Sequence, residues 1–173
     1  MKNNTKWIIT IFILSFTLSL LFSGVSTVMS NKFNNIVLVL VTIIVVFIGI
    51  AFDMIGVAVL TSNESSLHAK ASKKLQGAKA AITLLKNAPK VSSICQDVIG
   101  DICGIVSGSL GAVLTMNLAN SLNLNMTATS MLITAVVSTI TVGFKAVSKT
   151  IATKNADEIV YKVGKIKEFF KIN

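Results

Sequence analysis

Four long apolar segments, separated by short polar ones, dominate the pattern along the chain. They cover Trp7–Met29, Ile36–Thr61, Ser92–Leu118 and Met126–Val147. As helices rising about 1.5 Å per residue, segments of this length can cross about 30 Å of hydrocarbon. The pattern predicts an all-α integral membrane protein with four transmembrane helices, forming a single membrane domain over residues 1–173.

The first apolar segment follows a basic start, which is also typical of a signal peptide. Lys2 and Lys6 supply the charge. The segment is longer than the usual apolar region of a signal peptide, and no small-x-small cleavage site follows it. We therefore expect a retained first span.

Two polar segments repeat apolar residues at helical spacing. In residues 64–88 the apolar stripe contains Leu67, Ala71, Leu75, Ala78, Ile82 and Leu85. In residues 157–172 the stripe contains Ile159, Val163, Ile166 and Phe170, and Asn155 with Glu158 resembles a capping box. Lysines flank both stripes, which predicts two amphipathic helices lying in the membrane interface.

The distribution of charge predicts the orientation in the membrane. The formal net charge is +9, and all 16 basic residues are lysines. Both termini and the segment between the second and third spans hold every lysine except Lys32, so the positive-inside rule places these parts in the cytoplasm. We expect a multi-pass protein of the plasma membrane. The absence of arginine argues against nucleic-acid recognition.

The sequence contains no set of residues that predicts an enzyme. His68 is the one histidine, and no nucleophile–base pair or phosphate-binding loop appears. Cys95 and Cys103 lie eight residues apart on the third segment, too far for a disulfide in a helix, and belong to no zinc motif.

The third apolar segment carries two carboxylates, Asp97 and Asp101, beside a stripe of glycines. The stripe consists of Gly100, Gly104, Gly108 and Gly111. At about 100° per residue these positions share one side of a helix. Glycines at this spacing let another helix approach closely in lipid, so we predict a helix-packing surface here.

Charges within the apolar segments lie at a similar depth in the predicted topology. Asp53 interrupts the second segment, and Lys145 lies near the end of the fourth. With Asp97 and Asp101 they form a predicted cluster of one lysine and three carboxylates. The excess negative charge would bind a cation or a proton, with the aspartates as metal ligands. The alternative is a structural ion pair, for instance between Asp53 and Lys145.

Three segments resemble the transmembrane domain of the CorB/CorC/cyclin-M magnesium and cobalt transporters. They are Phe52–Ala81, Pro89–Ala112 and Lys149–Ile159, and the similarity spans the chain from Phe52 to Val160. Phe52, Ala58 and Gly77-Ala78-Lys79 match the family pattern. The resemblance implies a similar membrane fold and Mg²⁺ or another cation as the bound ion. No cofactor is otherwise expected.

The departures from this family fall on its ion site. Asp53 and Ile55 stand where the family has serines, and Lys145 where it has a glutamate; the family's asparagine positions fall on Gly100 and Gly104. A lysine in place of an anionic ligand disfavours a divalent ion. We expect a divergent member without the paired CBS modules, since the sequence ends at Asn173.

Two functions follow from these observations. The chain is either a small cation transporter or exchanger, or a non-transporting relative that acts as a membrane scaffold or partner subunit. A pore former of the holin kind is a third option, disfavoured by the three intramembrane aspartates. The expected partners are the lipid bilayer and either a second copy, as a homodimer, or another membrane protein.

Overall fold

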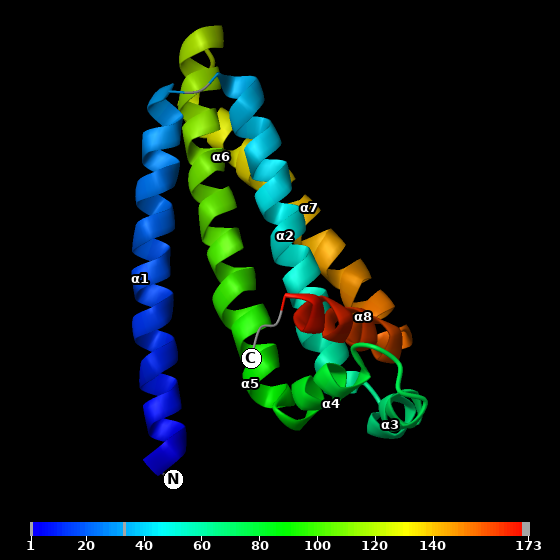
Figure 1. Ribbon diagram of the computed structural model, residues 1–173. Helices are drawn as coiled ribbons and strands as arrows, with labels where there is room; N and C mark the ends of the chain where they lie inside the picture. The colour runs from blue at the N-terminus through cyan, green and yellow to red at the C-terminus, as the bar shows by residue number, and fades with distance from the viewer. Residues whose placement is uncertain (1, 33, 171–173) are drawn as a thin grey trace. The chain divides into compact units, whose positions relative to one another are not determined.

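The computed structural model describes residues 2–32 and 34–170, and these residues form helices joined by short connections (Figure 1). In chain order the helices are α1 (Lys2–Lys32), α2 (Asn35–Thr61), α3 (Glu64–Ser72), α4 (Ala78–Lys86), α5 (Ala88–Ser93), the π-helix η1 (Ile94–Gly100), α6 (Asp101–Leu122), α7 (Met126–Lys154) and α8 (Ala156–Phe169). The described residues contain no strand, which confirms the predicted all-α class.

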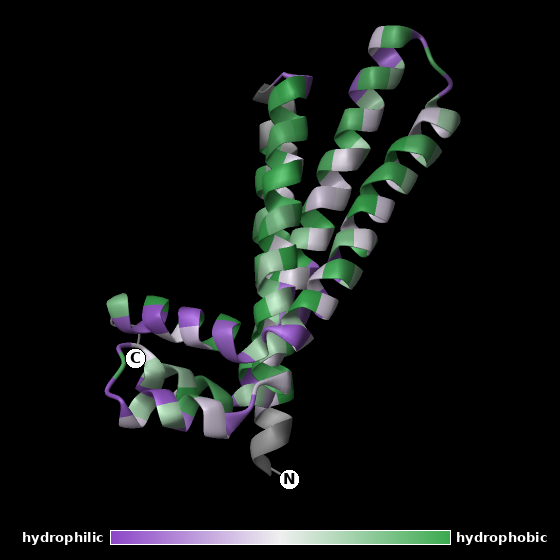
Figure 2. Cartoon of the chain, turned by 90° about the vertical axis from the view of Figure 1, so that its right-hand side faces the viewer, coloured by the Kyte–Doolittle hydropathy of each residue, from purple (hydrophilic) through white to green (hydrophobic). Residues whose placement is uncertain are grey.

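Within the part of the chain that the structure describes, four helical segments are long and apolar enough to cross a membrane. They are Trp7–Val25, Asn35–Thr61, Ala88–Leu122 and Met126–Lys154. Each overlaps one of the predicted spans, and their hydrophobic residues are conspicuous in Figure 2. The third segment is one continuous run of α5, η1 and α6. Its π-helix has wider i→i+5 turns, a form that is rare and frequently marks functional sites.

The contacts within the chain divide it into two compact units. The first contains the described residues up to Gly49 together with Val98–Gly143. The second contains Ile50–Asp97 together with the described residues from Phe144 onward. The division passes through α2, η1 and α7, so each of these helices contributes to both units.

The core of the first unit is an apolar stripe along η1 and α6, against which α1 and α2 pack. Its buried residues are Leu38, Val98, Ile102, Val106, Leu110 and Leu114. Five of these recur every four residues, as expected for one face of a helix. A Cβ added to Gly49 of α2 would lie 2.8 Å from the Cβ of Cys103, so these helices approach closely.

The core of the second unit joins the end of α2 and the end of α7 to α3, α4 and α8. Its buried residues are Ala58, Val59, Leu67, Ala81, Ala152, Ala156 and Val160. Small side chains let α4 and α8 cross in close contact. A Cβ added to Gly164 of α8 would lie 2.5 Å from the carbonyl oxygen of Gly77 and 2.8 Å from the Cβ of Ala81.

The prediction of one continuous helix over residues 64–88 is wrong, because the chain breaks between α3 and α4. Lys74 has a φ of 54° and Gly77 a φ of 85°, both in the left-handed region that ends a helix. A Cβ on Gly77 would also lie 2.6 Å from the backbone nitrogen of Lys165. Close contact with α8 therefore requires glycine and a turn at this point.

The start of α8 also differs from the prediction. The helix begins at Ala156, and Asn155 makes no side-chain cap. The amide of Asn155 instead donates to the carbonyl oxygen of Ile151 at 3.2 Å, which binds it to the end of α7. The predicted capping box with Glu158 is therefore wrong. The last residues of the predicted helix, 171 and 172, lie outside the described part of the chain.

The crossing of α4 and α8 makes the second unit sensitive to an added methyl group. We expect Gly164→Ala to lower the free energy of unfolding by about 1–3 kcal/mol, because the backbone of Gly77 cannot move aside as a side chain could. The melting temperature in detergent should fall by about 2–4 °C for each kcal/mol. Gly143→Ala is the control, since its Cβ would meet nothing described within 4 Å. Equal melting temperatures for the two variants would contradict this packing.

Candidate functional site

The one charged side chain within α2 is Asp53, and it is buried at 4% exposure. It lies on the same face of the helix as Gly49 and Gly56, at i, i+4 and i+7 spacing. A Cβ on Gly56 would lie 2.7 Å from the side chain of Gln96. The two glycines therefore allow close approach of neighbouring helices on either side of Asp53, which accounts for its burial.

The carboxylate of Asp53 is incompletely satisfied. Its Oδ2 is buried and accepts no hydrogen bond from the described residues. Burying a carboxylate without compensating partners is costly, so such a group binds a counter-charge, an ion or a proton. A buried ionisable group within an apolar span is for this reason a candidate functional site.

The counter-charge is Lys149 of α7, whose Nζ lies 4.0 Å from Oδ2 of Asp53. This distance is at the outer limit of an ion pair, and the Lys149 side chain is 53% exposed. The cation at this carboxylate is thus held loosely on a flexible stem. The contact between the two side chains is therefore long, and no other described side chain pairs with this oxygen of Asp53.

Lys145, the partner suggested by the sequence, does not form this pair. It is half-buried one turn before Lys149 on α7. The two lysines are four residues apart and share a helix face, so this spacing could have indicated both. The predicted end of the fourth span at Val147 placed Lys149 outside it, whereas α7 continues to Lys154.

Asp97 and Asp101 are both exposed, unlike Asp53. Oδ2 of Asp97 accepts a hydrogen bond of 2.7 Å from the hydroxyl of Ser93, one turn earlier. Asp97 belongs to the second unit with Asp53, and Asp101 to the first. Nowhere in residues 2–32 and 34–170 do three His, Cys, Asp or Glu side chains lie close enough to hold a metal ion.

The predicted glycine stripe divides into packed and open positions. Gly100 is buried, and its carbonyl oxygen lies 3.6 Å from where a Cβ on Gly49 would stand. Gly111 is buried, and a Cβ added to it would lie at ordinary contact distance from Val137 and Ile133 of α7. A Cβ on Gly104 or Gly108, by contrast, would meet no described atom within 4 Å. The face of α6 at these two glycines therefore has no close neighbour among the described residues, although Val106 and Leu110 on another face are buried.

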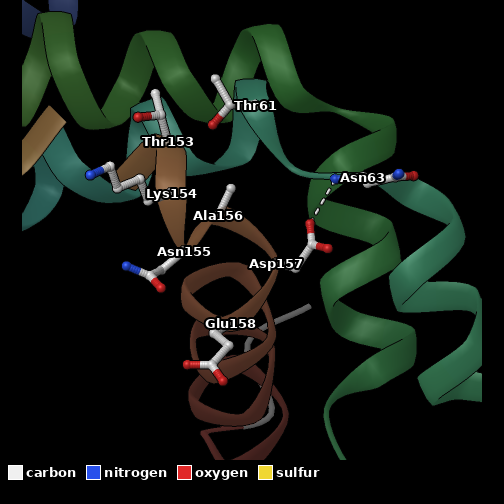
Figure 3. Close-up of a pocket in the computed structure, with 8 residues that line it drawn as sticks. All are labelled: Thr61, Asn63, Thr153, Lys154, Asn155, Ala156, Asp157 and Glu158. Carbon is white, nitrogen blue, oxygen red and sulfur yellow. Dashed lines mark hydrogen bonds between the residues drawn. The ribbon is translucent and has the colours of Figure 1, made fainter. Parts of the chain in front are cut away.

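A polar hollow in the second unit was not predicted from the sequence (Figure 3). It is lined by Thr61, Asn63, Thr153, Lys154, Asn155, Ala156, Asp157 and Glu158. Asp157 joins the start of α8 to the connection between α2 and α3. Its Oδ1 accepts hydrogen bonds from the Ser62 hydroxyl at 2.8 Å and the Asn63 N–H at 2.7 Å.

Asp157 is held in its charged form by this environment. Burial alone would raise its pKa, but the Asn63 N–H, the hydroxyls of Ser62 and Ser66, and the charge of Lys70 outweigh that effect. The pKa of Asp157 is therefore below its ordinary value. The sequence gave no signal for this contact, because more than ninety residues separate Asp157 from Ser62 and Asn63.

Comparisons with known proteins identify no relative. No protein-family model, no curated protein and no solved structure matches the chain. The resemblance to the magnesium and cobalt transporters remains a prediction from the sequence.

The bonds of Asp157 predict a pH-dependent contribution to stability. We expect Asp157→Ala to lower the free energy of unfolding by about 1–2 kcal/mol at neutral pH, because two hydrogen bonds to a carboxylate are lost. A lowered folded-state pKa stabilises the fold above the unfolded-state pKa, and this stabilisation is lost as the pH falls through the folded-state pKa. The difference between wild type and variant should therefore shrink on acidification. The measurement is thermal unfolding in detergent across this pH range.

The control for this prediction is Glu158→Ala, the neighbouring exposed carboxylate. It should change the melting temperature little at any pH. A deficit of Asp157→Ala that is the same at neutral and acid pH would contradict the proposed role of its charge.

Proposed function

We propose that this chain is an integral membrane protein that binds a cation at Asp53, in exchange with the ammonium group of Lys149. The observation that carries the proposal is the buried Oδ2 of Asp53, which accepts no hydrogen bond from the described residues and has Lys149 only at 4.0 Å. A divergent relation to the CorB/CorC/cyclin-M transporters fits this proposal, since Asp53 stands at one of that family's ion-site positions.

The chemistry of the site limits the cation. Carboxylate oxygens suit hard cations, and Mg²⁺ usually keeps several waters while binding one or two carboxylates. Asp53 would be the inner ligand, while Asp97 of the same unit would attract the ion by its charge. Lys149 acts as the internal competitor, which would release the cation when it returns to Asp53.

The orientation that we propose follows the lysine distribution, with both termini on the cytoplasmic side of the plasma membrane. Asp53 is eight residues before the end of α2, about 12 Å of helix rise from that end. In this orientation Asp53 lies nearer the cytoplasmic end of α2 than its other end. Transport would require a second state that opens it to the other side.

Calorimetric titration of the detergent-purified chain with Mg²⁺ tests the proposal. We expect saturable binding that Asp53→Asn abolishes. Lys149→Gln should bind at least about tenfold more tightly, since one unit charge about 4 Å away contributes several kcal/mol before screening by solvent. Lys145→Gln, one turn away, is the matched control and should have the smaller effect.

Failure of both the wild type and Lys149→Gln to bind Mg²⁺, Na⁺ or K⁺ would reject the cation site. The Asp53–Lys149 contact would then be a structural ion pair. In that case the two single charge reversals should destabilise the chain, and the double reversal should restore its melting temperature.

A second function, a membrane scaffold or partner subunit, is favoured by the open face of α6. Gly104 and Gly108 have no described atom within 4 Å of an added Cβ, and Asp101 is exposed beside them. An intramembrane carboxylate is normally covered by protein rather than by lipid. Another helix, from a second copy or a partner, would cover this face.

Gly108→Leu tests this association. A large side chain should keep the partner helix away and shift the chain toward monomer, as measured by subunit counting in nanodiscs. Gly24→Leu is the control, because Gly24 on α1 is equally open. If Gly108→Leu leaves the subunit count unchanged, or if both variants lower it equally, this face of α6 does not mediate the association.

A further inference from the structure

The two faces of α8 have different surroundings. The inner face, with Ala156, Val160 and Gly164, is buried within the second unit. The predicted apolar stripe lies on another side of the helix. Its first members, Ile159 and Val163, are half-buried, but the later residues of the stripe are left uncovered by the described chain.

The uncovered residues gather toward the end of α8. Ile166 is 56% exposed, Phe169 77% and Phe170 66%. The rings of Phe169 and Phe170 lie edge to face with their centroids 5.5 Å apart. Figure 2 shows hydrophobic and hydrophilic residues alternating along this helix, which leads to the C-terminus. Two adjacent exposed phenylalanines on an amphipathic helix require an apolar medium on that side.

The connections of the second unit determine which medium is within reach. Asn155 alone separates α8 from α7, and Ser62 and Asn63 alone separate α3 from α2. Both α2 and α7 are candidate membrane spans. A helix joined to a span by one residue remains at the membrane–water boundary when that span is inserted.

Positive charges outnumber negative ones around the exposed phenylalanines. Lys162 and Lys165 are exposed and share a side of α8 with Ile166 and Phe169, at i, i+3, i+4 and i+7 spacing. Glu168 is exposed as well, but its Oε2 accepts a hydrogen bond of 2.5 Å from the N–H of Gly77, which holds part of its charge at the contact with α4. The Nζ of Lys165 lies 4.9 Å from the centroid of the Tyr161 ring.

We propose that the α8 outer surface, consisting of Lys162, Lys165, Ile166, Phe169 and Phe170, docks onto a leaflet rich in anionic phospholipid. The apolar side chains enter the boundary between headgroups and acyl chains. The ammonium group of Lys162 lies at the level of the lipid phosphates, and that of Lys165 leaves the Tyr161 ring to join it there. Docking is independent of a cation at Asp53, and Asp53→Asn should leave it unchanged.

A tryptophan at position 169 reports on the docking in the full-length chain. The variant carries Trp7→Phe and Phe169→Trp, so its emission comes from one site. It is reconstituted into vesicles of phosphatidylcholine, alone or mixed with phosphatidylglycerol, with bromine on the acyl chains as quencher. Trp7→Phe with Ser72→Trp is the matched control, because Ser72 is exposed on α3 outside the α8 outer surface.

We expect the Phe169→Trp emission to be blue-shifted and quenched by brominated chains in the anionic vesicles, well beyond the Ser72→Trp control. Adding Lys162→Gln or Lys165→Gln should weaken docking about fivefold for each lysine. When both lysines are kept, salt near 1 M should weaken docking, because the Debye length falls to about 3 Å. Comparing docking at low and high salt, and in neutral and anionic vesicles, needs no lysine variant. This comparison therefore tests the proposal even if the lysine variants fold poorly.

Three results would overturn the proposal. Equal quenching by aqueous acrylamide in the Phe169→Trp and Ser72→Trp variants would mean that the surface faces water. Equal bromine quenching in neutral and anionic vesicles would show that the α8 outer surface does not prefer anionic lipid. Protection from acrylamide without bromine quenching, increasing with protein density, would identify a second copy of the chain as the occupant.

Discussion

Close approach of helices at small side chains is the constraint on which both units depend. Small side chains let two helix backbones come close enough for many van der Waals contacts. Gly49 and Gly56 provide this contact along α2, and Gly164 provides it where α4 crosses α8. Because Asp53 lies between the two α2 glycines on the same face, the same packing withdraws its carboxylate from solvent.

The helical class and the four apolar helices were predictable because they follow from the length and hydrophobicity of each segment, which can be read from the sequence alone. The break between α3 and α4 was not predictable, because Leu75 continues the apolar period while the chain turns at Lys74 and Gly77. The turn is explained by contacts of Gly77 with α8, namely the close backbone of Lys165 and the hydrogen bond from the Gly77 N–H to Glu168. Local periodicity therefore identified the helices, but long-range contacts decided where they end.

The candidate site was predictable in part for the same reason. A carboxylate inside an apolar run identifies Asp53, since its position alone makes it unusual. Its partner depends on how far α7 extends and on which turn of that helix meets α2, and this selects Lys149 over Lys145. The bonds of Asp157 depend on residues more than ninety positions away, so no local pattern contains them.

The π-helix η1 gives the third apolar helix a tolerance to changes in chain length. Its turns contain more residues than α-helical turns, so loss of one residue within Ile94–Gly100 can convert it to an α-helix. The same loss farther along α6 would rotate the following core residues, Leu110 and Leu114 among them, by about 100°. Natural single-residue deletions in this helix should therefore concentrate at η1.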